Sequence, residues 1–206
     1  MTDYARLDGH LKAIQSKIIK DAGFDYHNQL IDNSFKCFVT PGTFKNVLDV
    51  GFGTGYSLKK FKEAGIKVTG ITMNDEEMKA ATGHDVKIMD MAMLDFEDET
   101  FDFIWCRHAL EHSVMPFIAL LEFYRVLQGG GFVYVEVPSD CIFSIENESH
   151  YSLFRDEAWH ALFEKAGFSV KYRGQYALKK NTAPNTDHDV MFSDNYWYYA
   201  LRKEIK

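Results

Sequence analysis

The chain has 206 residues, of which 46% are apolar and 26% charged, and its formal net charge is −7. This length suits one α/β domain, and the acidic balance argues against general nucleic-acid binding, which needs a basic surface to displace phosphate counterions. Three cysteines at spacings that form no metal pair indicate reduced thiols. Because no signal peptide and no run of about 18 apolar residues are apparent, we expect a cytoplasmic protein without a membrane span.

The first forty residues predict two helices. Apolar residues recur at helical spacing over 4–20, namely Leu7, Leu11, Ile14 and Ile18. A second helix is expected over 27–36, before a Pro-Gly pair at 41–42 breaks the chain. We therefore interpret 1–42 as a helical extension that could act as a lid, and 43–206 as the main domain.

Strands and helices alternate from residue 46 onwards. Strands are expected over 46–50, 66–71, 86–89, 101–106, 132–137, 168–172 and 196–201. Helices are expected over 56–64, 75–81, 114–127 and 155–166. In the third of these helices, one face is expected to be buried: Val114, Phe117, Ile118, Leu121 and Tyr124. The alternation predicts a doubly wound, mostly parallel sheet that binds ligands beyond the C-terminal strand ends, where the strand order reverses.

Three glycines follow the first strand at alternate positions: Gly51, Gly53 and Gly55. Glycine loses much backbone freedom on folding, so the cluster indicates that a ligand approaches the backbone closely. The Gly-x-Gly-x-Gly spacing and the absence of an acid at the end of the next strand disfavour a nicotinamide cofactor, and no Walker Gly-Lys-Ser/Thr follows. Asp49, two residues before the glycines, would repel a pyrophosphate and suits a ligand with an ammonium group.

Several segments in order resemble the class I S-adenosylmethionine-dependent methyltransferases, in their small-molecule branch. Residues 47–55 (VLDVGFGTG) are similar to the first motif, 90–92 to the acidic motif after the third strand, 101–105 to the fourth-strand motif, 108–112 (HALEH) to a Leu-Glu-His element, 125–132 to the Arg-Val-Leu-Lys-Pro-Gly-Gly turn, and 150–154 with 166–168 to the segment before the sixth strand.

The resemblance implies a Rossmann-like sheet of seven strands, mostly parallel with an antiparallel last strand. It also implies S-adenosylmethionine as the cofactor and methyl transfer to an O, N or C nucleophile of a small or medium-sized acceptor. The alternative is a non-catalytic partner or sensor that binds the same cofactor.

The resemblance assigns cofactor contacts to Asp49, Gly51, Phe52, Gly53, Gly55, Thr72, Met73, Asn74, Asp90, Met91, Arg107 and His108. It implies that Asp49 holds the loop or the amino group, and that Asp90 and Met91 contact the adenine. Many relatives have an acid where this chain has Thr72. We therefore expect weaker ribose binding, or help from Glu76 or Glu77.

His112 and His108 are the candidate catalytic residues. An imidazole titrates near neutral pH and suits a general base, although His112 could equally cap a helix or orient a loop. The four-residue spacing could place both rings on one helical face, but no further ligand spacing is apparent, so no metal is expected. The long segment 138–150 should carry substrate contacts. The candidate substrate residues are Asp140, His150 and Tyr151.

Overall fold

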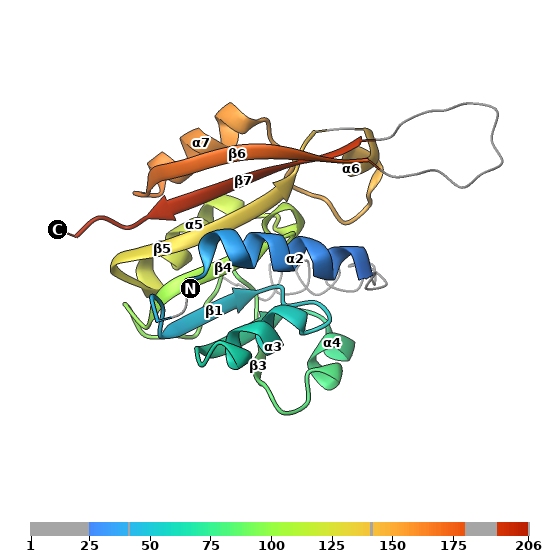
Figure 1. The fold of residues 1–206 in the computed structure, drawn as a ribbon. Helices are drawn as coiled ribbons and strands as arrows, with labels where there is room; N and C mark the ends of the chain where they lie inside the picture. Colours follow the sequence, from blue (N-terminus) through green and yellow to red (C-terminus); the bar gives the residue numbers. More distant parts are fainter. Residues whose placement is uncertain (1–24, 41, 141, 180–192, 206) are drawn as a thin grey trace, which may run out of the picture.

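The computed structural model describes residues 25–40, 42–140, 142–179 and 193–205. They contain one sheet in the order β3-β2-β1-β4-β5-β7-β6 (Figure 1). The strands are β1 (Asn46–Val50), β2 (Lys67–Thr72), β3 (Asp85–Ile88), β4 (Phe101–Arg107), β5 (Leu127–Pro138), β6 (Ser169–Lys179) and β7 (Ser193–Arg202). Only β7 runs antiparallel to its neighbours among these strands. The predicted seven-stranded, doubly wound sheet with an antiparallel last strand is confirmed.

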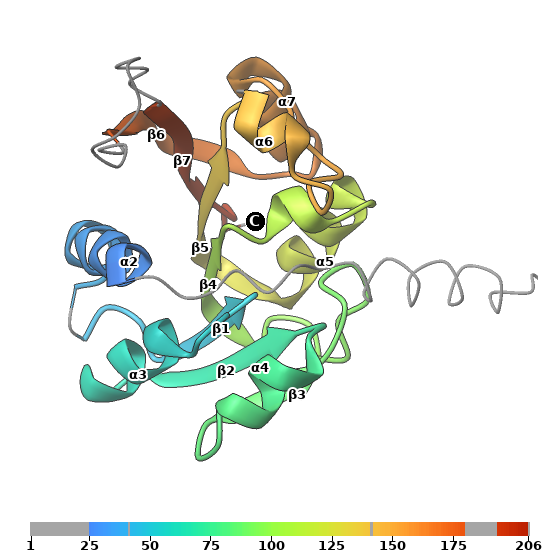
Figure 2. The same ribbon diagram turned by 90° about the vertical axis from the view of Figure 1, so that its right-hand side faces the viewer.

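Helices cover both faces of the sheet. They are α2 (Asp25–Phe38), α3 (Tyr56–Glu63), α4 (Asp75–Ala80), α5 (Pro116–Val126), α6 (Ile142–Glu146) and α7 (Asp156–Lys165), with a short 3₁₀ helix η1 (Leu110–His112). Figure 2 shows α2 and α3 on one side of the sheet and α5 and α7 on the other. None of the helices in the described ranges is long and apolar enough to cross a membrane.

Alternate residues of the central strands pack into two separate hydrophobic cores, one on each face of the sheet. Leu48 and Ile104 face the cluster that contains residues of α5 and α7, whereas Val47 and Trp105 face the cluster beneath α2 and α3. Strands buried on both faces therefore read as continuous apolar runs in the sequence, which is why β1 and β4 were predicted within one residue of their ends. β5 and β6 are longer than predicted, since they span 127–138 and 169–179 where 132–137 and 168–172 were expected. The expected helix over 4–20 lies outside the described residues.

Helix α2 packs directly on the sheet. Its Phe35 lies 5.0 Å from Phe61, and its Phe38 lies 4.6 Å from Tyr134, measured between ring centroids. The side chain of Ser34 donates a hydrogen bond to Glu136 on β5 at 3.1 Å. The predicted second helix of the extension is thus a covering layer of the sheet.

The predicted inward face of the helix over 114–127 is only partly correct. Phe117 and Tyr124 pack against the core, whereas Val114, Ile118 and Leu121 are exposed. The buried residues of α5 are instead Pro116, Ala119, Leu120, Phe123 and Val126. The segment is apolar almost all round, so its sequence periodicity did not distinguish the two faces.

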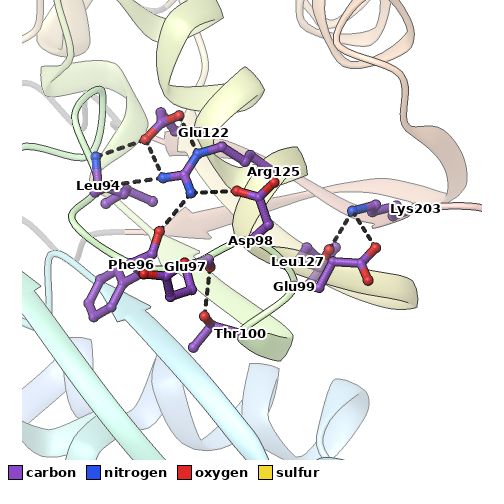
Figure 3. A network of polar contacts seen from close by, with 10 residues as sticks. All are labelled: Leu94, Phe96, Glu97, Asp98, Glu99, Thr100, Glu122, Arg125, Leu127 and Lys203. Atoms are coloured by element: carbon purple, nitrogen blue, oxygen red, sulfur yellow. Dashed lines mark hydrogen bonds and ion pairs between the residues drawn. The ribbon is translucent and has the colours of Figure 1, made fainter.

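Arg125 on α5 fixes the connection between β3 and β4 (Figure 3). Its guanidinium donates to the backbone oxygens of Leu94 and Phe96 at 2.8 and 2.6 Å and to the carboxylates of Asp98 and Glu122 at 2.8–2.9 Å. All five guanidinium N–H groups have partners in this arrangement. The two carboxylates raise the pKa of Arg125 above its ordinary value.

Candidate functional site

A cavity of about 510 Å³ lies at the C-terminal ends of β1, β2 and β4, where the strand order reverses between β1 and β4. This volume is within the range of ligand and cofactor sites. The lining comes from the glycine loop, the ends of β2 and β4, the segment after β3, α2 and the segment after α6. The cavity is therefore where doubly wound sheets bind their ligands.

The glycine loop after β1 forms one wall of the cavity. Gly51 has a φ of 70°, and a Cβ placed there would lie 2.7 Å from the Cβ of Ala109, so a side chain would clash. Gly53 has a φ of 54°, and an added Cβ would meet nothing within 4 Å. Gly53 therefore leaves its backbone open to a ligand, whereas Gly55 begins α3 and does not line the cavity.

Asp49 stands beneath this loop. Its carboxylate is buried and accepts a 2.5 Å hydrogen bond from Ser57, the second residue of α3. Burial raises the pKa of Asp49 to about 7, and the hydroxyl of Ser57 only partly opposes that shift. A cation placed against Asp49 would favour its ionised form.

A carboxylate from the helix that follows β2 lies at the end of that strand. The hydroxyl of Thr72 donates to Glu77 of α4 at 2.5 Å, and Asn74 caps that helix by accepting from the backbone N–H of Glu76 at 2.9 Å. These residues and Met73 all line the cavity. An acid therefore lies at the strand end despite the neutral Thr72.

The segment after β3 contributes apolar and acidic residues. Met89, Asp90 and Met91 line the cavity, and the Asp90 carboxylate accepts from the backbone N–H of Ala92 at 2.8 Å. This bond turns the chain directly after the strand and fixes the Asp90 side chain.

A buried polar network joins the ends of β4 and β5. Glu136 accepts hydrogen bonds from Tyr134 and Tyr176, and its Oε1 lies 2.8 Å from Arg107 Nε and 2.9 Å from His108 Nε2. Burial raises the pKa of Glu136, but the charge of Arg107 and the hydrogen bonds lower it by more. The pKa of Glu136 therefore lies well below its usual range. Arg107 Nη2 is buried and has no hydrogen-bond partner among the described residues.

The expected helical face carrying His108 and His112 is wrong. His108 has a φ of 51° and precedes η1, so the two rings point to different neighbours. Nδ1 of His112 lies 2.8 Å from the carbonyl oxygen of Ser149, whereas Nε2 of His108 contacts Glu136. Both histidines line the cavity, but only His112 faces the segment after α6.

The segment 138–150 contributes different residues from those expected. Its cavity-lining residues are Asn147 and Ser149. Asp140 instead contacts Arg155 at 3.3 Å on the surface, and Tyr151 is exposed. His150 lies behind the lining, with its ring 4.9 Å from that of His112. The segment is also not one loop, because it contains α6.

Comparison with known proteins identifies the domain. The profile of a family described as "Methyltransferase domain" matches residues 48–135, which hold the glycine loop, β4 and its following segment, and most of β5. Residues 48–135 therefore match a methyltransferase domain, in agreement with a class I S-adenosylmethionine-dependent methyltransferase. S-adenosylmethionine is the cofactor of this family, and the methyltransferase residues 48–135 supply most of the cavity lining.

Individual relatives agree with this family. The sterol 24-C-methyltransferase of Debaryomyces hansenii is 26% identical over 186 residues, covering 78% of this chain and 46% of that protein. The 2-methyl-6-phytyl-1,4-hydroquinone methyltransferase of Synechocystis is 37% identical over 103 residues, covering 46% and 32%. The chain thus spans less than half of either relative.

A solved structure agrees on the fold. It is an S-adenosylmethionine-dependent methyltransferase from Archaeoglobus fulgidus, with a TM-score of 0.66 at 18% identity over 85% of this chain and 94% of that one.

The methyltransferase cavity fits such a cofactor. S-adenosylmethionine carries a sulfonium and an ammonium charge, and four acidic residues line the same cavity as the open backbone of Gly53: Asp49, Glu76, Glu77 and Asp90. Methionine side chains and Phe52 give the same cavity apolar walls that suit an adenine ring.

Four residues of this site were not identified as site residues from the sequence. Glu136 is a lone acid inside the apolar strand 132–137, and that position alone could have identified it. Ser57 and the lining residues of α2, Asn28 and Ile31, gave no signal of their own. Their roles follow from the packing of α2 and α3 on the sheet.

A second cluster adjoins the methyltransferase cavity. Glu111, His112 and His150 each place a potential ligand atom within 4.8 Å of the others. The Glu111 carboxylate is buried and accepts no hydrogen bond within the described residues. His108 Nδ1 lies 3.6 Å from Glu111 Oε1. Burial raises the pKa of Glu111, but the surrounding imidazoles outweigh this effect and lower it.

Proposed function

We propose that the chain transfers a methyl group from S-adenosylmethionine to an O, N or C nucleophile of a small or medium-sized molecule. The observation that carries this proposal is the open backbone of Gly53 beside the buried carboxylate of Asp49, both in a cavity at the strand-order reversal. An acidic cavity of this shape suits a sulfonium cofactor better than a pyrophosphate.

The glycine loop and Asp49 would hold the methionine part. Gly51 and Gly53 let the backbone reach the ligand, while Ser57 fixes the Asp49 carboxylate for the loop or the amino group. The buried Nη2 of Arg107 is a donor without a partner among the described residues, and the methionine carboxylate is a suitable acceptor for it.

Glu77 would hold the ribose. A carboxylate accepts both ribose hydroxyls, and Thr72 keeps that of Glu77 at the end of β2 through a 2.5 Å hydrogen bond. Met73 and Asn74 complete this wall. The chain thus replaces the usual strand-end acid with one from the first turn of α4.

Asp90 and Met91 would bind the adenine. Asp90 has a second carboxylate oxygen beyond the one that accepts from Ala92, and it can accept from the exocyclic amino group. Met91 and Met89 can pack against the ring faces, because thioether side chains make favourable contacts with aromatic rings.

The acceptor would enter between α2, η1 and the segment after α6. Ile31, Val114 and Met115 make this region apolar, and Asn147 and Ser149 add polar groups. Two relatives are named for a sterol and a phytyl hydroquinone, so an apolar acceptor with a hydroxyl or carbon nucleophile is the class we favour. Asp140 and Tyr151 lie outside the lining and are dropped as acceptor contacts.

Positioning is the main contribution of these residues. The cofactor supplies a methyl group bound to a sulfonium sulfur. When the nucleophile takes this methyl group, the rest of the cofactor leaves as a neutral thioether. The protein must align the nucleophile with that carbon, a factor generally worth several kcal/mol. His112 can take a proton from a hydroxyl acceptor, because its Nδ1–H is committed to Ser149 and its Nε2 carries a lone pair. His108 is unsuited to that task, since Glu136 and Glu111 hold its ring and raise its pKa.

S-adenosylhomocysteine formation tests this function. The purified chain is incubated with S-adenosylmethionine and a panel of sterols, prenylated hydroquinones and polar amines, and methylated products are identified by mass spectrometry. We expect product with at least one apolar acceptor and none with Gly53→Asp. Cofactor binding without turnover on any acceptor class would contradict catalysis and favour the sensor alternative.

A further inference from the structure

We propose that Glu111, His112 and His150 bind a divalent transition-metal ion of the Zn²⁺ class beside the cofactor cavity. One potential ligand atom from each side chain lies within 4.8 Å of the other two. Two imidazoles and one carboxylate are a donor set that Zn²⁺ and its first-row neighbours prefer. This inference goes beyond methyl transfer and does not depend on it.

The hydrogen bonds of both histidines occupy Nδ1 and leave Nε2 available to a metal. Nδ1 of His112 lies 2.8 Å from the carbonyl oxygen of Ser149, and Nδ1 of His150 lies 2.9 Å from that of Ser144. A carbonyl oxygen only accepts, so both Nδ1 atoms must carry the proton, which leaves a lone pair on each Nε2. A backbone carbonyl behind one ring nitrogen is the usual orienting partner of a metal-bound imidazole.

Glu111 is the second, independent observation. Its side chain is 1% exposed, yet neither carboxylate oxygen accepts a hydrogen bond among the described residues. A buried carboxylate without hydrogen bonds is costly, and the His108 imidazole at 3.6 Å contacts Glu111 without donating one to it. A cation between Glu111 and the other two imidazoles would give the carboxylate a direct ligand contact.

The backbone already holds the three ligands in place. The carbonyl oxygen of Glu111 accepts from the N–H groups of Tyr151 and Ser152 at 2.9 Å, which ties η1 to the segment after α6. Tetrahedral coordination at about 2.0–2.2 Å needs ligand atoms about 3.4 Å apart. The side chains must therefore close by up to about 1.4 Å, a shift within the reach of rotamer changes on this fixed backbone.

An ion held there would face the methyltransferase cavity. His112 lines the cavity, and so do its neighbours Ser113 and Ser149. Three protein ligands leave at least one coordination position for a water or for an acceptor oxygen. In that arrangement the ion would lower the pKa of a bound hydroxyl, and His112 would act as its ligand instead of as the proton acceptor.

Co²⁺ binding to the metal-free full chain tests the site, because Co²⁺ reports its ligand field by visible absorption. We expect one equivalent to bind with the bands of a four- or five-coordinate nitrogen–oxygen site, without thiolate charge transfer, and to be displaced by Zn²⁺. His150→Ala and Glu111→Gln should each weaken binding by at least about a hundredfold, since even residues behind metal ligands contribute about 10–100-fold.

A matched surface pair controls for adventitious binding. His160 and Glu164 lie 3.6 Å apart on α7, at i and i+4, and His160→Ala should leave Co²⁺ affinity unchanged. Circular dichroism checks that each variant is folded. Failure of the wild-type chain to bind either ion, or equal binding by wild type and folded His150→Ala, would overturn the proposal. Neither result bears on methyl transfer, because the assay contains no cofactor.

Discussion

Two polar networks of this chain are built from similar residues but differ in how completely they are satisfied. Around Arg125, every guanidinium N–H has a partner, and the arrangement fixes the connection between β3 and β4. At the end of β4, Arg107 Nη2 and both carboxylate oxygens of Glu111 are buried without hydrogen-bond partners among the described residues.

The difference separates structural polar groups from ligand-binding ones. A fully satisfied network stabilises the fold and has nothing left to offer a ligand, whereas buried groups without partners are costly unless something else binds them. The unsatisfied network lies at the C-terminal strand ends beside the cavity, and the satisfied one lies away from it. We therefore expect changes in the unsatisfied groups, Arg107 Nη2 and Glu111, to affect ligand binding, and changes in the satisfied Arg125 network to affect stability.

Glu136 is the counter-charge of the buried Arg107 beside the cavity, and its removal should have the largest effect on stability. Glu136→Gln leaves the buried guanidinium of Arg107 without its counter-charge, so we expect a loss of about 3–5 kcal/mol in the free energy of unfolding. Urea denaturation measures this, with the exposed Glu63→Gln as the control. A loss no larger than that of the control would contradict the account.

The same carboxylate predicts a pH dependence. The pKa of Glu136 in the folded chain lies below its unfolded value of about 4.3. Its contribution is therefore complete above about pH 5 and is lost as the pH falls towards the folded pKa. Wild type should lose more stability than Glu136→Gln on acidification below pH 5, which denaturation at a series of pH values would show.

Arg125→Lys breaks the satisfied network while keeping the charge. A lysine cannot reproduce the planar fork, so we expect a loss of about 2 kcal/mol in stability. Because this network does not reach the cavity lining, the affinity for S-adenosylmethionine should stay within about threefold of wild type. Thermal unfolding and calorimetry measure the two effects. A large loss of affinity without a loss of stability would contradict the structural role of the Arg125 network.

Glu77→Gln tests the ribose contact. Losing a charged acceptor for two hydroxyls should weaken S-adenosylmethionine binding about tenfold, which corresponds to about 1.4 kcal/mol. Asp75→Asn, in the same first turn of α4 but outside the cavity lining, is the matched control. Equal affinity of both variants would show that Glu77 does not hold the ribose.

The raised pKa of Asp49 predicts that cofactor binding releases a fraction of a proton. With a pKa of about 7, this carboxylate is about half protonated at pH 7, and a bound cation favours its ionised form. Binding of S-adenosylmethionine should therefore release up to about half a proton, whereas Asp49→Asn should release none. Calorimetry in two buffers of different ionisation enthalpy measures this release, and identical values for both proteins would refute it.

The sequence was sufficient for the parts of the site that follow a strand closely. Gly51, Gly53 and Asp49 were predicted because a buried strand and its turn are read from adjacent residues. The same holds for Asp90, which directly follows β3 and lines the cavity. Their roles as ligand contacts stay predictions, although their positions at the cavity are now established.

The rest of the site depends on contacts between distant residues. Glu111 and His150 are 39 positions apart, and only the docking of the segment after α6 on η1 brings them together. The prediction of the buried face of α5 was correct for only part of its residues, because an apolar helix does not reveal which side meets the sheet. Neither feature has a local pattern that could have predicted it.

The central claim is that the glycine loop binds S-adenosylmethionine at the open backbone of Gly53. Calorimetric titration of the purified wild type, Gly53→Asp and Glu122→Gln tests it most directly. Aspartate tolerates the left-handed conformation of this position, so Gly53→Asp should fold but occupy the ligand's space. We expect micromolar binding by wild type and Glu122→Gln and none by Gly53→Asp. No binding by wild type, or equal binding by folded Gly53→Asp, would contradict the account.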